Sequence, residues 1–135
     1  MADPHAPTPI RREDHGAVAR LVLSSPQNYN ALSREMIAAL RDALDAIATD
    51  EAVRVVVIAA EGKAFCAGMD LTAEGNVFGL DESLTPVLSD MEDLDDPGLA
   101  RVRDTGGRVA LAIHACRKPV IAAVDEAGYK AVRSS

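Results

Sequence analysis

The sequence has few of the features that mark secreted, membrane-spanning or nucleic-acid-binding proteins. Its 135 residues include only two cysteines, Cys66 and Cys116, which have neither a CxxC spacing nor the spacing of a disulfide framework. No apolar run approaches the ~20 residues of a membrane span, and residues 1–9 carry no signal-peptide pattern. The 14 basic residues are outnumbered by 21 acidic ones, whereas a nucleic-acid partner would require a basic face. We therefore expect a protein of a reducing, cytoplasmic compartment, with no nucleic acid and no membrane as partner.

The residues that are abundant predict one folded α/β domain. Hydrophobic residues make up 48% of the chain, a globular composition, and 135 residues suffice for one domain with a core. Their spacing predicts, in order, strands at 10–15 and 17–23, a helix at 33–49, a strand at 53–60, a helix at 98–118 and a strand at 120–124. Ser33 is expected to cap the first helix, and the second is one helix or two that meet at Gly106 and Gly107. The last strand is expected to be parallel and buried, because it is uninterruptedly apolar.

A glycine-bearing loop at 61–71 follows the predicted strand at 53–60, and the rest of the chain is organised around it. The end of a strand in an open α/β layer is the usual place for a binding site. Small residues at Ala64, Ala67 and Gly68 let a ligand approach the backbone closely. The loop offers backbone N–H groups, which suits a site that holds a developing negative charge on a carbonyl oxygen.

The same loop resembles a motif of a known family. Its sequence Gly-Lys-Ala-Phe-Cys-Ala-Gly-Met-Asp-Leu, residues 62–71, resembles the first oxyanion-hole motif of the crotonase family, the enoyl-CoA hydratases and isomerases. Residues 25–32, which end in Asn-Ala-Leu, resemble the family's early loop, and residues 118–124 resemble the strand that leads to the second oxyanion motif. The three motifs agree in order and spacing. The resemblance implies a crotonase-like α/β fold, a spiral of ββα units, truncated after the strand that precedes the second oxyanion motif.

The resemblance also implies chemistry on acyl-CoA thioesters, as in fatty acid metabolism. Family members stabilise an enolate-like intermediate with two backbone N–H donors, and motif position assigns the first donor to Met69. The positions implied to bind the CoA substrate are Tyr29, Ala67, Gly68, Met69, Asp70 and Leu71. Of these, Asp70 is implied to serve the structure and not to act as a base. The resemblance implies no cofactor, because coenzyme A is part of the substrate, and it implies a homo-oligomer, either a trimer or a hexamer.

Beyond Val124 the sequence departs from the family pattern. Asp125 and Glu126 stand where the family has Asn-Gly, and Gly128 stands alone where a glycine cluster is expected. The predicted organisation is a flexible tail at 1–9, the N-terminal part of a crotonase-like domain at 10–124 and a non-family tail at 125–135. The second oxyanion donor and the catalytic carboxylates would then be missing, so the predicted function is an impaired enoyl-CoA hydratase or isomerase. The alternatives are a non-catalytic remnant that binds CoA or associates with other subunits, and an unrelated small α/β binding domain.

Several other features have simple interpretations. The stretch 72–97 is acidic without a basic residue. It is expected to be a solvated, mobile loop or short helix, or else a lid over the acyl end of the substrate. Cys66 is expected to be a small buried residue, because no base is visible beside it, and the three histidines predict no metal site. Half a spiral would leave the strand at 120–124 and one face of the second helix without cover, which predicts self-association. The carboxylates without motif support as catalysts include Glu74, Glu82 and Glu92.

Overall fold

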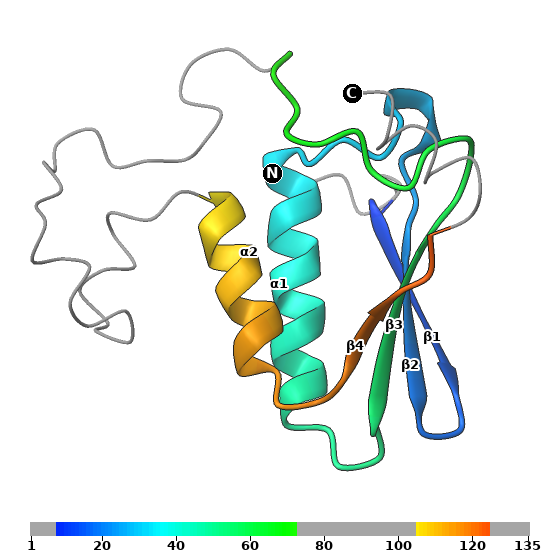
Figure 1. Cartoon of the computed structure of the whole chain (residues 1–135), viewed down its shortest axis with the longest axis vertical. Helices are drawn as coiled ribbons and strands as arrows, with labels where there is room; N and C mark the ends of the chain where they lie inside the picture. The colour runs from blue at the N-terminus through cyan, green and yellow to red at the C-terminus, as the bar shows by residue number, and fades with distance from the viewer. Residues whose placement is uncertain (1–7, 73–104, 125–135) are drawn as a thin grey trace, which may run out of the picture.

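The computed structural model contains one mixed sheet with two helices on the same face (Figure 1). It describes residues 8–72 and 105–124, and all structural statements below concern these residues. The elements are β1 (Ile10–His15), β2 (Val18–Leu23), a short 3-10 helix η1 (Pro26–Asn28), α1 (Arg34–Ala48), β3 (Val55–Ala60), α2 (Thr105–Ala115) and β4 (Val120–Ala122). The sheet order is β1-β2-β3-β4, and α1 packs beside α2. This is the α/β layer that the sequence predicted.

The first two strands form the predicted hairpin. β1 and β2 pair antiparallel, with Ile10 opposite Leu23 and His15 opposite Val18. Gly16 lies in the connecting turn with a φ of 60°, a left-handed conformation that glycine adopts at little cost. β3 then pairs with β2 in parallel, which requires a crossover connection, and α1 provides it.

Helix α1 forms because its capping and its apolar spacing agree. The Ser33 hydroxyl accepts a hydrogen bond from the Met36 N–H at 3.1 Å, as expected of a helix N-cap, and Glu35 lies in the first turn. The apolar residues recur every three or four positions and face the sheet. The buried residues of this face are Met36, Ile37, Leu40, Leu44 and Ile47. They join residues of β2 and β3 in one core, so the predicted amphipathic helix is confirmed.

The second helix and the last strand complete the layer. The prediction of a helix at 98–118 is confirmed over Thr105–Ala115, and its earlier part lies outside the described residues. Gly106 and Gly107 both lie within this helix. Lys118, which follows it, donates hydrogen bonds to the carbonyl oxygens of Ile47 and Asp50 and thereby anchors the start of β4 beneath the end of α1.

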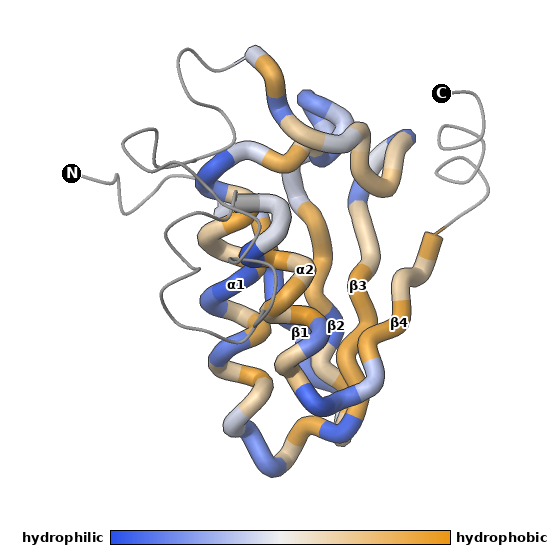
Figure 2. Tube along the Cα trace, turned by 60° about the vertical axis from the view of Figure 1, so that its left-hand side comes forward, coloured by the Kyte–Doolittle hydropathy of each residue, from blue (hydrophilic) through white to orange (hydrophobic). Residues whose placement is uncertain are grey.

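The prediction that the last strand is buried is wrong. β4 is parallel to β3, as expected, but it is shorter than predicted and forms the edge of the described sheet. As a result Ile121 is 53% exposed and Val124 is 42% exposed. Both β3 and β4 are hydrophobic along their length, whereas hydrophobic and hydrophilic residues alternate along α1 (Figure 2). Val120 packs against the core, whereas Ile121 lacks a cover within the described part of the chain.

Some predictions fall on residues that the structure does not describe. These are the expected tail from residue 1 to 7, the acidic stretch from residue 73 onward and the expected tail at 125–135. Among the helices of residues 8–72 and 105–124, none is long and apolar enough to cross a membrane.

Candidate functional site

The loop after β3 is held against the loop after β2 by three backbone hydrogen bonds. The Leu32 N–H donates to the Gly68 carbonyl oxygen at 2.7 Å, and the Asp70 N–H donates to the Leu32 carbonyl oxygen at 3.1 Å. Together these two bonds form an isolated parallel bridge between Leu32 and Met69. The Ala67 N–H donates to the Tyr29 carbonyl oxygen at 3.0 Å. The structure thus brings together Tyr29 and residues 67–70, which the resemblance had placed in one site.

The bridge determines where the backbone of Met69 points. In a parallel bridge, the residue opposite the doubly bonded one turns its own N–H and C=O to the other side. Leu32 is the doubly bonded residue here, so the N–H of Met69 is directed away from it. Among the described residues, no acceptor pairs with that N–H. A backbone N–H that is held in place on both sides and has no acceptor among residues 8–72 and 105–124 can donate a hydrogen bond to a ligand.

Gly68 turns the chain immediately before this donor. Its φ is +93°, a value that residues with a side chain rarely adopt. A Cβ added there would meet no atom within 4 Å, so the backbone conformation, and not space, is what requires glycine. Ala67 on the other side of it is exposed. The approach to Met69 along the backbone is therefore bordered by small residues.

Two large apolar side chains flank the same region in an exposed state. Tyr29 is 57% exposed and Leu71 is 68% exposed. The side chain of Met69 itself is half-buried and packs against the core. An exposed tyrosine and leucine beside a fixed polar backbone group offer apolar contact area to a ligand that carries a carbonyl.

Asp70 is engaged in a local turn. Its carboxylate accepts hydrogen bonds from the Thr72 N–H at 2.9 Å and from the Thr72 hydroxyl at 2.6 Å. These hydrogen bonds lower the pKa of Asp70, because they favour its ionised form. A carboxylate with a lowered pKa is a weak base, so this geometry fits the structural role that the resemblance implies.

The sulfur and aromatic side chains of the loop face the interior. Phe65 and Cys66 are half-buried and pack against the core, and the Cys66 sulfur accepts a hydrogen bond from the Gly68 N–H at 3.4 Å. Cys66 is thus only partly buried, where full burial was expected. No group of three His, Cys, Asp or Glu side chains able to hold a metal ion occurs in the ranges 8–72 and 105–124.

A pocket of about 220 Å³ adjoins the loop on the sheet side. Its walls are formed by small residues, one aromatic ring and one cation: Arg20, Ala59, Ala60, Gly62, Ala64, Phe65 and Ala123. None of the six residues implied to bind the substrate lines this pocket. It lies beside the candidate site without containing it.

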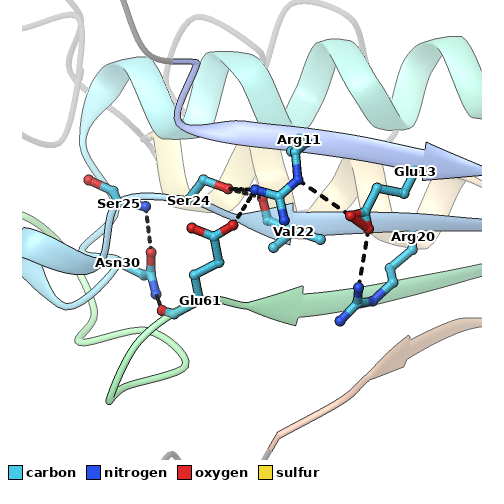
Figure 3. A network of polar contacts seen from close by, with 8 residues as sticks. All are labelled: Arg11, Glu13, Arg20, Val22, Ser24, Ser25, Asn30 and Glu61. Atoms are coloured by element: carbon cyan, nitrogen blue, oxygen red, sulfur yellow. Dashed lines mark hydrogen bonds and ion pairs between the residues drawn. The ribbon is translucent and has the colours of Figure 1, made fainter.

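A polar network that no sequence pattern indicated connects the start of the loop to the sheet. Arg11 binds the Glu61 carboxylate, hydrogen-bonds the Ser24 hydroxyl at 3.3 Å and pairs with Glu13, which in turn pairs with Arg20 at 3.1 Å (Figure 3). The hydrogen bond to Glu61 raises the pKa of Arg11, so this arginine stays charged. Its charge is already compensated, which leaves Arg11 poorly suited to bind a CoA phosphate.

Asn30 is the functional candidate that sequence reasoning missed. The sequence indicated only that it belongs to the loop at 25–32, yet it is 0% exposed and its side chain joins two loops. The only available signal was its place in the Asn-Ala-Leu stretch, because the partners of its amide are far away in the sequence.

The fold and the loop define a class of protein: an α/β layer in which a parallel strand ends in a glycine loop, with a fixed backbone N–H that has no acceptor among the described residues. Comparison with known proteins specifies the class further. The model of the enoyl-CoA hydratase/isomerase family matches residues 18–127. The chain therefore belongs to the enoyl-CoA hydratase/isomerase family, and its sheet and helices are those of the crotonase fold.

Individual relatives agree with this assignment. The chain is 36% identical over 114 residues to an enoyl-CoA hydratase of Alternaria alternata, covering 83% of this chain and 32% of the relative. It is similar to a probable enoyl-CoA hydratase of Mycobacterium tuberculosis, with 36% identity over 84% of this chain and 38% of the relative. The crystal structure of an enoyl-CoA hydratase from Mycobacterium smegmatis superposes with a TM-score of 0.60 at 40% identity, covering 86% of this chain and 39% of the other. The chain thus spans about a third of the length of the curated relatives it matches.

Proposed function

We propose that the loop at 61–71 binds the thioester carbonyl of an acyl-CoA and that the backbone N–H of Met69 donates a hydrogen bond to its oxygen. The observation that carries this proposal is the Leu32–Met69 bridge, which fixes the Met69 N–H and leaves it without a backbone partner among the described residues. A donor that is already oriented needs no rearrangement when charge develops on the oxygen. Such a donor stabilises an enolate-like intermediate more than the neutral thioester.

The surface around this donor supports CoA binding in particular. Ala67 and Gly68 leave the backbone accessible, while Tyr29 and Leu71 expose apolar area on either side. Asp70 holds the end of the loop through Thr72. The proposal involves no cofactor, since the coenzyme A is part of the substrate.

The reaction that we propose for the family site is hydration or isomerisation of an enoyl-CoA, to which this chain contributes one oxyanion donor. Two carboxylates of the loop are already engaged, Asp70 with Thr72 and Glu61 with Arg11. This observation favours the second candidate function, in which the 135 residues alone bind CoA or associate with other subunits without efficient catalysis. We also propose the reducing, cytoplasmic compartment that the sparse cysteines predict.

Binding can be tested with a saturated thioester that the reaction would not consume. Titration of the ¹⁵N-labelled chain with butyryl-CoA is expected to shift the amide resonance of Met69 more than those of the sheet. Leu71→Ser is expected to weaken binding about tenfold, because the loss of apolar contact is worth roughly 1–2 kcal/mol. Ile121→Ser on β4 replaces another exposed apolar side chain, 53% exposed against 68% for Leu71; it serves as the matched control and is expected to leave the affinity unchanged.

Two outcomes of this titration would contradict the proposal. One is the absence of binding at millimolar butyryl-CoA. The other is binding that shifts resonances elsewhere and leaves residues 67–71 unaffected. Since Leu71 is exposed, its replacement is not expected to unfold the chain, so a loss of affinity can be attributed to the contact.

Self-association is proposed separately, on the basis of β4. Ile121 is exposed on the edge strand β4 and Val124 is exposed two residues beyond its end, and uncovered apolar edges promote pairing with another chain. Light scattering of the purified chain at concentrations on the order of 50 μM is expected to give a mass above that of a monomer. Ile121→Lys is expected to lower that mass, and Arg54→Lys, at an exposed site, provides a charge-conserving control. A monomeric mass for the unaltered chain would exclude this proposal.

A further inference from the structure

Asn30 is completely buried, and its side chain joins the two loops of the candidate site. Its Oδ1 atom accepts a hydrogen bond from the Ser25 N–H at 2.8 Å. Its Nδ2 atom donates to the carbonyl oxygens of Glu61 at 2.8 Å and of Ala64 at 2.9 Å. Figure 3 shows the amide between Ser25 on one side and Glu61 on the other. One side chain thus connects the loop after β2 with the first residues of the loop after β3.

The backbone on both sides of Asn30 holds the far end of the same loop. Tyr29 accepts the hydrogen bond of the Ala67 N–H, and Leu32 makes both hydrogen bonds of the bridge to Met69. The loop after β3 is therefore attached twice to one short segment, at its start by the Asn30 side chain and at its end by the neighbours of Asn30. A displacement of the segment would move both attachments together.

We infer that Asn30 is a positioning residue for the Met69 N–H. By binding Glu61 and Ala64, it fixes the segment 29–32 relative to β3, and that segment then fixes the direction of the Met69 amide. The consequence for acyl-CoA binding rests on the proposed function, whereas the positioning itself does not.

The chemistry of the position explains why asparagine stands there. Asn30 has a φ of 55°, in the left-handed region that asparagine tolerates better than most residues with a side chain. The site also requires two N–H donors and one acceptor on a short side chain, which a primary amide supplies. Aspartate would place a carboxylate oxygen against two carbonyl oxygens, and glycine would leave both carbonyl oxygens without this donor.

Hydrogen exchange can separate positioning from general stabilisation. In Asn30→Gly the left-handed backbone is retained and the three side-chain bonds are lost. The amides of Leu32 and Asp70, which donate across the bridge, are expected to exchange about tenfold faster, because the loop opens locally. The amide of Leu21 in the centre of β2 is expected to keep its rate. Asn28→Gly, the same chemical change two residues earlier in η1, is the matched control.

The outcomes distinguish this inference from its alternatives. If the amides of Leu21, Leu32 and Asp70 exchange faster by the same factor, Asn30 serves overall stability only and the inference is overturned. The inference is also overturned if the Leu32 and Asp70 amides exchange at the same rates in Asn30→Gly as in Asn28→Gly. If Asn30→Gly does not fold, Asn30→Asp is used, which keeps the acceptor for Ser25 and loses the two donors. Failure of both variants to fold would also overturn the inference.

Binding of butyryl-CoA is a separate test. If the unaltered chain binds no butyryl-CoA, the proposed function fails, while the exchange rates still decide the inference about Asn30. If it binds, Asn30→Gly is expected to weaken binding about tenfold relative to Asn28→Gly.

Discussion

Replacing Gly62 with alanine is expected to lower the free energy of unfolding by about 2–5 kcal/mol. Gly62 has a φ of +87°, and an added Cβ would lie 2.7 Å from the Cβ of Pro26. The left-handed backbone alone costs a residue with a side chain roughly 1–2 kcal/mol. The contact adds roughly 1–3 kcal/mol, because the first residue of η1 would have to move. Denaturant unfolding followed by circular dichroism measures the sum.

Two other glycines make this prediction specific. Gly16 has a φ of +60° and Gly68 a φ of +93°, but an added Cβ would meet nothing within 4 Å at either position. Gly16→Ala and Gly68→Ala should therefore show the backbone cost alone, roughly 1–2 kcal/mol. If Gly62→Ala costs no more than these two, Pro26 does not pack against Gly62 as described.

The purified 135-residue chain is expected to hydrate crotonyl-CoA near the limit of detection. The proposed function assigns one oxyanion donor to this chain, and a reaction of this type that has one donor in place of two loses about 10²–10³ in rate. A reaction that also proceeds without a positioned pair of carboxylates loses another ~10²–10⁴, although the two effects need not add. The loss of enoyl absorbance after addition of the chain measures turnover, and a relative of full length provides the positive control.

Rapid turnover would contradict this expectation and would indicate a catalytic group that can be located by mutation. Asp70 already accepts two hydrogen bonds from Thr72, so Asp70→Asn should change any residual rate little. A rate abolished by replacing an acidic residue with glutamine would instead locate a catalytic group in the stretch after residue 72. The acidic residues to test are Glu74, Glu82 and Glu92, which lie outside the described residues.

The sheet and first helix could be predicted because their signals are local. The apolar spacing of α1 and the Ser33 cap lie within a few residues of one another, the run of β3 is continuously apolar, and only Arg20 interrupts that of β2. The composition of β4 predicts burial, and only the resemblance to half a spiral predicted that this strand would lack cover, because exposure depends on which strand lies beside it. The sequence of an apolar strand does not reveal whether that strand lies at the edge or in the centre of its sheet.

The candidate site was likewise predictable only where its signals are local. The glycine loop and its position after a strand follow from the sequence, but its attachments do not. The Asn30 amide finds acceptors 31 and 34 residues away, and Arg11 finds Glu61 50 residues away. No periodicity indicates such pairs, because they form only when the parallel arrangement of β2 and β3 brings the two loops together.

The anchoring of Lys118 beneath the end of α1 has a consequence for chain length. Together with the pairing of β3 and β4, it fixes the point to which the chain returns after residue 72, whatever path it takes between. The entropy of closing such a connection grows only with the logarithm of its length, so that doubling the length costs only about 0.6 kcal/mol. Insertions and deletions between residues 73 and 104 are therefore inexpensive for the layer on either side. We therefore expect variants of this chain that are longer or shorter in this interval to keep β4 and α1 in their places.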